Sequence, residues 1–179
     1  MDQDSSIRCN GTLCVADKNV RYQFPKGVTV GAINKSCTYG DATFSVDWDG
    51  TNCPSGIGAV TFGSGNVASG KSSSDSSISG GQENKARGTE SSVSGGSGND
   101  ASGNNASVSG GQENDASENN ASVSGGSKNK ASGSWATVSG GADNEASGDF
   151  ATVSGGFKNE ASGLHSSISG GQENKARGT

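Results

Sequence analysis

The chain has 179 residues, of which 28% are hydrophobic and 31 are glycine. A conventional globular core needs about 45–50% apolar residues, so this composition excludes an ordinary enzyme-like globule. The net charge of −5 gives no reason to expect nucleic acid or an anionic membrane as a partner, and no apolar run approaches the ~20 residues of a membrane span. What remains is disorder or a repeat architecture with a thin, continuous core.

All four cysteines lie in the first third of the chain. An even number of cysteines in a short polar segment is typical of two disulfides formed in an oxidising compartment. Three pairings are possible, and Cys9–Cys14 with Cys37–Cys53 is only a working guess among them. A zinc site is the alternative, but the spacings contain no paired CxxC motif and no histidine lies nearby, so we expect no metal.

Three short segments of the same region alternate in the manner of β-strands, namely residues 20–24, 28–33 and 42–48. We therefore expect residues 1–56 to form a small, disulfide-stapled, β-rich N-terminal capping domain. Such a domain would cover the end of the segment that follows, residues 57–179, because an open sheet edge invites association.

The first residues contain no apolar signal segment. The cysteines nevertheless suggest secretion, and Asn10 and Asn34 begin glycosylation sequons. A mature secreted form that carries an added initiator Met1 reconciles these observations.

Residues 57–179 repeat with a period of 15. The unit reads Ser/Ala-Ser/Thr-Val/Ile-Ser-Gly-Gly-x-x-Asn-x-Ala-Ser/Arg-Gly-x-x. The first copy is degenerate and carries a short insertion around residues 71–75, and residues 76–89 and 166–179 are identical. The Ser-Gly-Gly step begins at Ser79, Ser94, Ser109, Ser124, Ser139, Ser154 and Ser169.

A short, fixed period is typical of stacked coils that bury their apolar edges on one another. Glycine, serine and asparagine interrupt the unit too often for helices, whereas alternation fits strands. We expect Ala106, Val108 and Gly110 to point inward, and Ser107 and Ser109 to point outward. The prediction is an all-β fold, a parallel β-solenoid of about eight 15-residue coils.

One asparagine per coil falls on the predicted inner side. Stacked asparagines can form an amide ladder that bonds the turn backbone, and each buried amide needs partners. The predicted ladder consists of Asn66, Asn84, Asn99, Asn114, Asn129, Asn144, Asn159 and Asn174.

Residues 121–126 and 129–133 carry a resemblance to a known family. Their strings, Ala-Ser-Val-Ser-Gly-Gly and Asn-Lys-Ala-Ser-Gly, resemble the head repeats of trimeric autotransporter adhesins. The resemblance implies a left-handed parallel β-roll in an extracellular adhesive or structural rod that binds glycan or matrix. The period here is longer by one residue, and Gly110 stands where that family usually has a second aliphatic residue, which puts the family's trimer in doubt.

Charged residues form columns on the outside of the predicted coils. One column alternates in sign through Glu113, Lys128, Asp143, Lys158 and Glu173. Opposite charges on neighbouring strands stabilise modestly. We interpret the column as a solvated ion-pair ladder rather than as calcium sites.

The other strand carries only hydroxyl residues at its two outward positions. Its two files lie ~6.7 Å apart along a strand and ~4.8 Å apart between coils. A flat, rigid, uncharged array can order water, and this one resembles the Thr-x-Thr arrays of β-solenoid ice-binding proteins, with Ser mostly replacing Thr. Alternatively, Ser and Thr simply suit exposed β positions. The predicted ice-binding residues are Ser77, Ser79, Ser92, Ser94, Ser107, Ser109, Ser122, Ser124, Thr137, Ser139, Thr152, Ser154, Ser167 and Ser169.

A turn column precedes the hydroxyl strand. Asn105 and Asn120 begin sequons there, so glycans could crowd this edge. Trp135 and Phe150 follow in the same column, with His165 after them. The two aromatic residues form an exposed patch for a sugar or a partner, or they cover the turn and pack between coils; both readings stay open.

The motifs that suggest catalysis have simpler explanations. Residues 65–72 match the phosphate-binding GxxxxGK(S/T) pattern, but no helix is expected after them and the repeat register explains the match. The segment 47–50 is too short for a calcium loop. His165 is the only histidine, so no catalytic triad can be assembled. We expect no enzyme activity and no cofactor.

Two functions remain. The leading hypothesis is a secreted ice-binding protein whose partner is ice or ordered water at the hydroxyl files. The alternative is an adhesive or structural rod with a glycan or matrix ligand and an oligomeric state that stays open.

Overall fold

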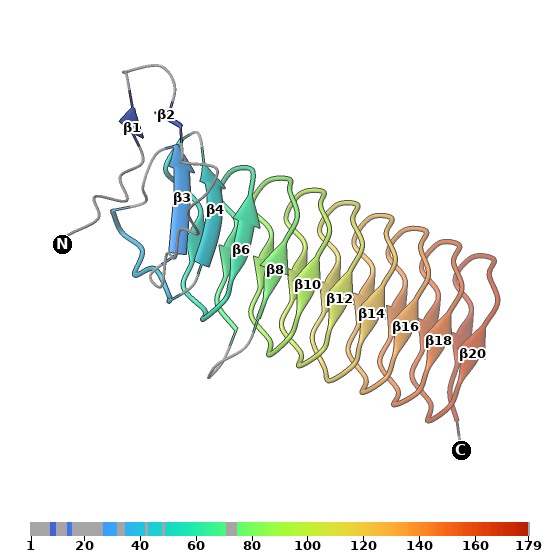
Figure 1. The fold of residues 1–179 in the computed structure, drawn as a ribbon. Coiled ribbons are helices and arrows are strands. Elements are labelled where there is room, and N and C mark those ends of the chain that lie inside the picture. The colour runs from blue at the N-terminus through green and yellow to red at the C-terminus, as the bar shows by residue number, and fades with distance from the viewer. Residues whose placement is uncertain are drawn as a thin grey trace.

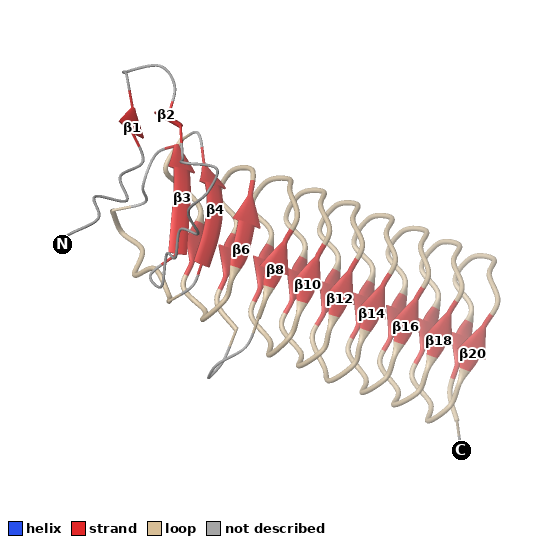
Figure 2. Ribbon diagram, viewed as in Figure 1, coloured by secondary structure: helices blue, strands red, loops and turns tan. Residues whose placement is uncertain are grey.

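The computed structural model describes residues 8–9, 14–15, 27–31, 35–41, 43–47, 49–70 and 75–178. These residues form strands, turns and loops, with no helix among them (Figure 2). Within this part of the chain, no helix is therefore of a length and hydropathy to cross a membrane. The chain winds into a regular solenoid whose coils stack side by side along one axis (Figure 1). The predicted parallel β-solenoid is confirmed.

Two parallel sheets run the length of the solenoid. The ten-stranded sheet consists of β3 (Gly27–Gly31), β4 (Thr43–Asp47), β6 (Val60–Phe62), β8 (Ser77–Ile78), β10 (Ser92–Val93), β12 (Ser107–Val108), β14 (Ser122–Val123), β16 (Thr137–Val138), β18 (Thr152–Val153) and β20 (Ser167–Ile168). The nine-stranded sheet consists of β5 (Cys53–Pro54), β7 (Val67–Ala68), β9 (Lys85–Ala86), β11 (Asp100–Ala101), β13 (Asp115–Ala116), β15 (Lys130–Ala131), β17 (Glu145–Ala146), β19 (Glu160–Ala161) and β21 (Lys175–Ala176).

Neighbouring strands pair in a register that places each repeat position on its own equivalent. Ser92 pairs with Ser107, and Ser107 pairs with Ser122. The second sheet follows the same rule, since Ala101 pairs with Ala116. A side chain therefore lies next to the same repeat position of the coils before and after it. Each position thus forms its own column along the solenoid, and each column has its own residue preference.

The core is narrow and consists of three columns of small residues. Ala106 and Val108 are buried, as predicted. Ala116 of the second sheet is buried as well, and the equivalents of these residues line the whole described array. Burial of one Val side chain stabilises by about 1.5–3 kcal/mol, so stability accumulates coil by coil. The predicted inward direction of Gly110 is wrong: a Cβ built there meets no atom within 4 Å. The chain turns after Ser109, which directs this position to open space.

The next glycine of the repeat has a steric reason. Gly96 has φ +84°, in the left-handed region, and a Cβ there would lie 2.1 Å from the carbonyl oxygen of Gly111 in the next coil. At Gly95, directly before it, a Cβ would meet nothing. In each Gly-Gly pair, the second glycine is therefore required because two backbones approach closely, whereas a side chain at the first glycine would have free space.

The N-terminal region continues both sheets. The segments predicted as strands at 28–33 and 42–48 correspond to β3 and β4, and the segment predicted at 20–24 lies outside the described residues. β3, β4 and β5 extend the solenoid sheets to Gly27, so the division into domains 1–56 and 57–179 stays a prediction.

One of the two guessed disulfides is present. It joins Cys37 to Cys53, with 5.5 Å between their Cα atoms. β1 (Arg8–Cys9) and β2 (Cys14–Val15) pair antiparallel with Cys9 opposite Cys14. The side chains of Cys9 and Cys14 lie outside the described part of the chain, so their pairing stays a prediction.

Candidate functional site

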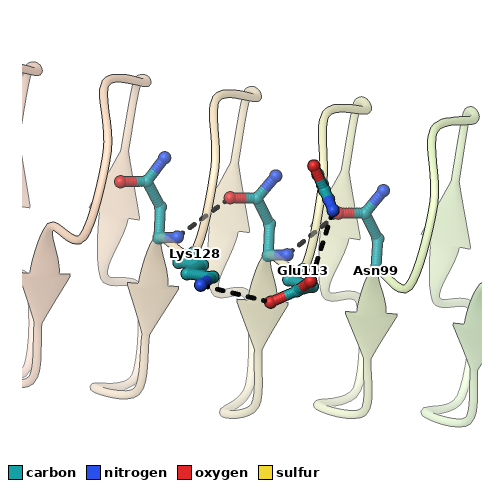
Figure 3. Close-up of polar contacts among 6 residues, drawn as sticks. Asn99, Glu113 and Lys128 are labelled. Carbon is teal, nitrogen blue, oxygen red and sulfur yellow. Dashed lines mark hydrogen bonds and ion pairs between the residues drawn. The ribbon is translucent and has the colours of Figure 1, made fainter.

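The asparagine ladder makes the solenoid a rigid platform for its surfaces. The Nδ2 of Asn114 donates to the carbonyl oxygens of Gly110 (2.9 Å) and Gly126 (3.0 Å). Its Oδ1 accepts a bond from the backbone N–H of Asn129 (3.0 Å). The same backbone-to-amide bond joins Asn114 to Asn99, as the close-up shows (Figure 3). The predicted ladder is confirmed, and each buried amide is satisfied.

The hydroxyl files lie on the outward side of the ten-stranded sheet. The first file, which includes Ser107, Ser122 and Thr137, is half-buried apart from the exposed Ser167. The second file, Ser79, Ser94, Ser109, Ser124, Ser139, Ser154 and Ser169, is exposed in each of these coils. Within the first file, the hydroxyl of Ser107 donates to that of Ser122 over 3.2 Å.

The hydroxyl files end at an apolar surface that the sequence analysis did not identify. Val60 pairs with Ser77, and Phe44 pairs with Val60, so the first file continues into apolar residues. The second file continues into Val46 and Phe62. In these coils the polar residues lie inside instead. The hydroxyl of Thr61 is buried and donates to that of Ser45 over 2.9 Å. The sequence shows this reversal in Phe-Ser-Val at 44–46 and Val-Thr-Phe at 60–62, where a polar residue stands between two apolar ones. In the repeat, Ser-Val-Ser has the opposite order.

The charge columns form ion pairs between coils. Lys128 Nζ lies 3.8 Å from Glu113 Oε2 (Figure 3), and Lys175 Nζ lies 2.8 Å from Glu160 Oε2. The hydrogen bond and the charge of Lys175 lower the pKa of Glu160. These side chains are largely exposed, so the pairs contribute little stability and instead keep this side of the rod solvated.

Two like charges meet in a neighbouring column. Asp100 pairs with Asp115 in the register of β11 and β13. Partial burial raises the pKa of the Asp115 carboxyl, and the Asp100 carboxylate raises it further. Arg87, which forms an ion pair with Asp100, compensates part of this repulsion.

The short acidic segment near residue 47 has a structural role. Asp47 Oδ1 accepts a bond from Gly50 N (2.9 Å), and its Oδ2 accepts one from Asn52 N (2.7 Å). Bonds from the hydroxyls of Ser64 and Thr51 lower the pKa of Asp49 to about 2. Across the described residues, no group of three or more His, Cys, Asp or Glu side chains could hold a metal ion.

An aromatic file occupies the turn before the hydroxyl strand. Trp135 and Phe150 have ring centroids 6.5 Å apart with planes within 4°. Phe150 and His165 follow at 4.8 Å and 16°. Trp135 is 57% exposed and Phe150 is 49% exposed. The sequence left two interpretations open, an exposed patch or packing between coils, and the structure shows both: the rings stack between coils and also form an exposed surface.

The sequons fall into two groups. Asn105 and Asn120 lie in the same turn column as the aromatic file, and Asn105 is exposed. Asn10 and Asn34 lie outside the described residues. Glycosylation at these four positions stays a prediction.

One family model matches part of this array. Residues 151–163 match the ubiquitous surface protein adhesin repeat. They include β18 and β19 and so cover most of one 15-residue coil. The resemblance to trimeric autotransporter adhesin repeats is therefore supported by both sequence and fold. No curated protein matches the chain. The adhesin repeat and the disulfide together indicate an extracellular or surface protein.

Proposed function

We propose that this chain is a non-enzymatic adhesive rod that acts outside the cell through the surfaces of its solenoid. The observation that carries the proposal is the match of residues 151–163 to an adhesin repeat within a regular stack of the same unit. A stack of this kind presents every surface position once per coil, about 4.8 Å apart, so weak contacts repeat along an extended ligand.

The rigidity of the array supports this function. The buried asparagines are hydrogen-bonded across neighbouring coils, and the valine and alanine columns are continuous. A rigid surface loses little conformational entropy when it binds, which is an advantage for a protein that holds an extended ligand.

Adhesion is tested with the purified full chain on immobilised matrix proteins and on an oligosaccharide array. We expect saturable binding to at least one of these surfaces, and light scattering gives the oligomeric state in parallel. Absence of binding to every matrix protein and every glycan would overturn the adhesive function.

Ice binding remains a second candidate, and one observation favours it. The exposed file through Ser109, Ser124 and Ser139 is uncharged and in constant register. Replacing these three serines by Tyr would break the flat surface, and thermal hysteresis and ice recrystallisation are the measurements. If the wild-type chain shows neither activity, ice binding is wrong. If the triple variant keeps both, the ice-binding surface lies elsewhere.

A further inference from the structure

The aromatic file at Trp135, Phe150 and His165 is placed where the backbone disfavours such residues. All three have positive φ, of 60°, 58° and 57°. In the two preceding coils, the same turn position holds Asn105 and Asn120, also at positive φ. Asparagine is among the residues that tolerate this left-handed conformation, whereas a bulky ring there costs free energy.

The core does not explain the rings either. Trp135 and Phe150 are about half exposed, and the neighbouring Leu164 is 64% exposed. Trp135 and Phe150 lie nearly parallel with 6.5 Å between their centroids, too far for their faces to cover each other fully, whereas His165 stacks more closely on Phe150, at 4.8 Å. Stacking between the rings offsets part of this cost, but it leaves both rings about half exposed. Large exposed rings in strained turns of consecutive coils therefore indicate a binding surface.

The size of this surface points to a small, linear ligand. A side chain of this kind presents about 150–250 Å2 when fully exposed, so the two half-exposed rings and Leu164 supply roughly 350 Å2. A stable protein–protein interface needs about 800 Å2 from each partner. The aromatic file is therefore too small to hold a second copy of the chain or another folded protein.

Polar groups flank the rings at the same edge. The Asp149 Oδ1 accepts a bond from the backbone N–H of Ser134 (2.9 Å), which holds this carboxylate beside the file. Asn105 and Asn120 continue the column with amide groups that both donate and accept. Half-exposed rings next to amide and carboxylate groups fit a ligand that has apolar C–H faces and many hydroxyls.

We propose that the file Trp135–Phe150–His165 binds β-linked pyranose oligosaccharides along the axis of the rod. In β-linked sugars of the gluco series, such as cellotetraose and chitotetraose, the substituents are equatorial, so each ring has an apolar C–H face that packs on an aromatic ring while its hydroxyls reach Asn120 and Asp149. The coil spacing of ~4.8 Å is close to the length of one sugar unit in a β-linked chain. This inference deepens the proposed adhesive function, on which it rests, by naming the ligand class and the edge that binds it.

The test compares wild type with the variants Trp135→Asn, Phe150→Asn and the double variant. Asn is the residue of this column in the preceding coils, so the variants relieve the positive φ and should keep or raise the melting temperature. Both substitutions create sequons, and a bacterial host without N-glycosylation avoids modification. Phe157→Gln is the matched control. It removes a ring from a different column, in which Gln112 and Gln172 are the equivalents.

Binding is measured by titration calorimetry with cellotetraose and chitotetraose, and with α-linked maltotetraose for comparison. We expect each ring substitution to weaken binding of a β-linked tetraose by about tenfold or more, with Phe157→Gln unchanged. Equal affinity of wild type and double variant would overturn the site while leaving the adhesive rod intact. Binding to a matrix protein but to no oligosaccharide would likewise overturn the site and leave the adhesive rod intact. Absence of both would overturn the site and the proposed function together.

Discussion

Replacing Asn114 by Ala tests how much the amide ladder contributes to the stacking of the coils. The substitution removes two bonds donated by Nδ2, to Gly110 and Gly126, and one accepted from Asn129. The Gly126 oxygen keeps its bond from the backbone of Gln112 (2.9 Å). The buried N–H of Asn129 keeps no acceptor, which costs about 1–3 kcal/mol, and each lost bond adds about 0.5–1.5 kcal/mol.

Counting the orphaned N–H and the two bonds donated by Nδ2, we therefore expect Asn114→Ala to lower the free energy of unfolding by about 2–6 kcal/mol. Thermal and denaturant unfolding followed by circular dichroism measure this change, and hydrogen exchange of the Asn129 amide locates it. Asn119→Ala is the control, because Asn119 is exposed in the same part of the array and should lose less than about 0.5 kcal/mol. A loss below about 1 kcal/mol for Asn114→Ala, or one equal to the control, would show that the aliphatic columns alone hold the coils.

Three further predictions concern single positions. Gly96→Ala should destabilise the chain by several kcal/mol, roughly 2–4, because its Cβ meets backbone, whereas Gly95→Ala should change the melting temperature little; equal effects would contradict the steric argument. Ser166 has a buried hydroxyl with no partner among the described residues, so Ser166→Ala should raise stability by about 1 kcal/mol. Ser91→Ala removes a hydrogen bond from the Ser91 hydroxyl to the Gly88 carbonyl oxygen (2.8 Å), so this substitution should lower the stability. Asp115→Asn should raise the melting temperature at pH 7. Since the raised pKa means that protonation favours the folded state, this gain should vanish below the carboxyl's ordinary pKa of about 3.9, and a gain that persists at pH 3 would refute the electrostatic cause.

The repeat could be predicted because each column has one physical requirement. Val108 and Ala116 fill a narrow interior, and Asn114 must bond the turns above and below it. A constant step of 15 residues places these requirements in register without any knowledge of the structure. The predicted inward direction of Gly110 is wrong because the in–out alternation of a strand ends at Ser109, where the chain turns, and does not extend to Gly110.

The N-terminal coils could not be placed from a period because their steps differ. Phe44 pairs with Val60, 16 residues on, and Val60 pairs with Ser77, 17 residues on. Parallel pairing tolerates turns of unequal length, so the sheets continue where the repeat becomes unrecognisable. The strained turn at Trp135 was also hidden, since its conformation follows from its neighbours in the stack and not from its own residue type.

The constant register makes the length of the rod independent of its cross-section. Removing residues 92–106 would join Ser91 to Ser107 and leave all columns in phase, because Ser92 and Ser107 occupy equivalent places. The molecule would shorten by one increment of about 4.8 Å, whereas a deletion that is not a whole number of 15-residue units would take the columns out of phase unless a turn absorbed the difference. The length of such a rod can change in whole coils. Duplication of a repeat therefore lengthens the rod while each face keeps its chemistry.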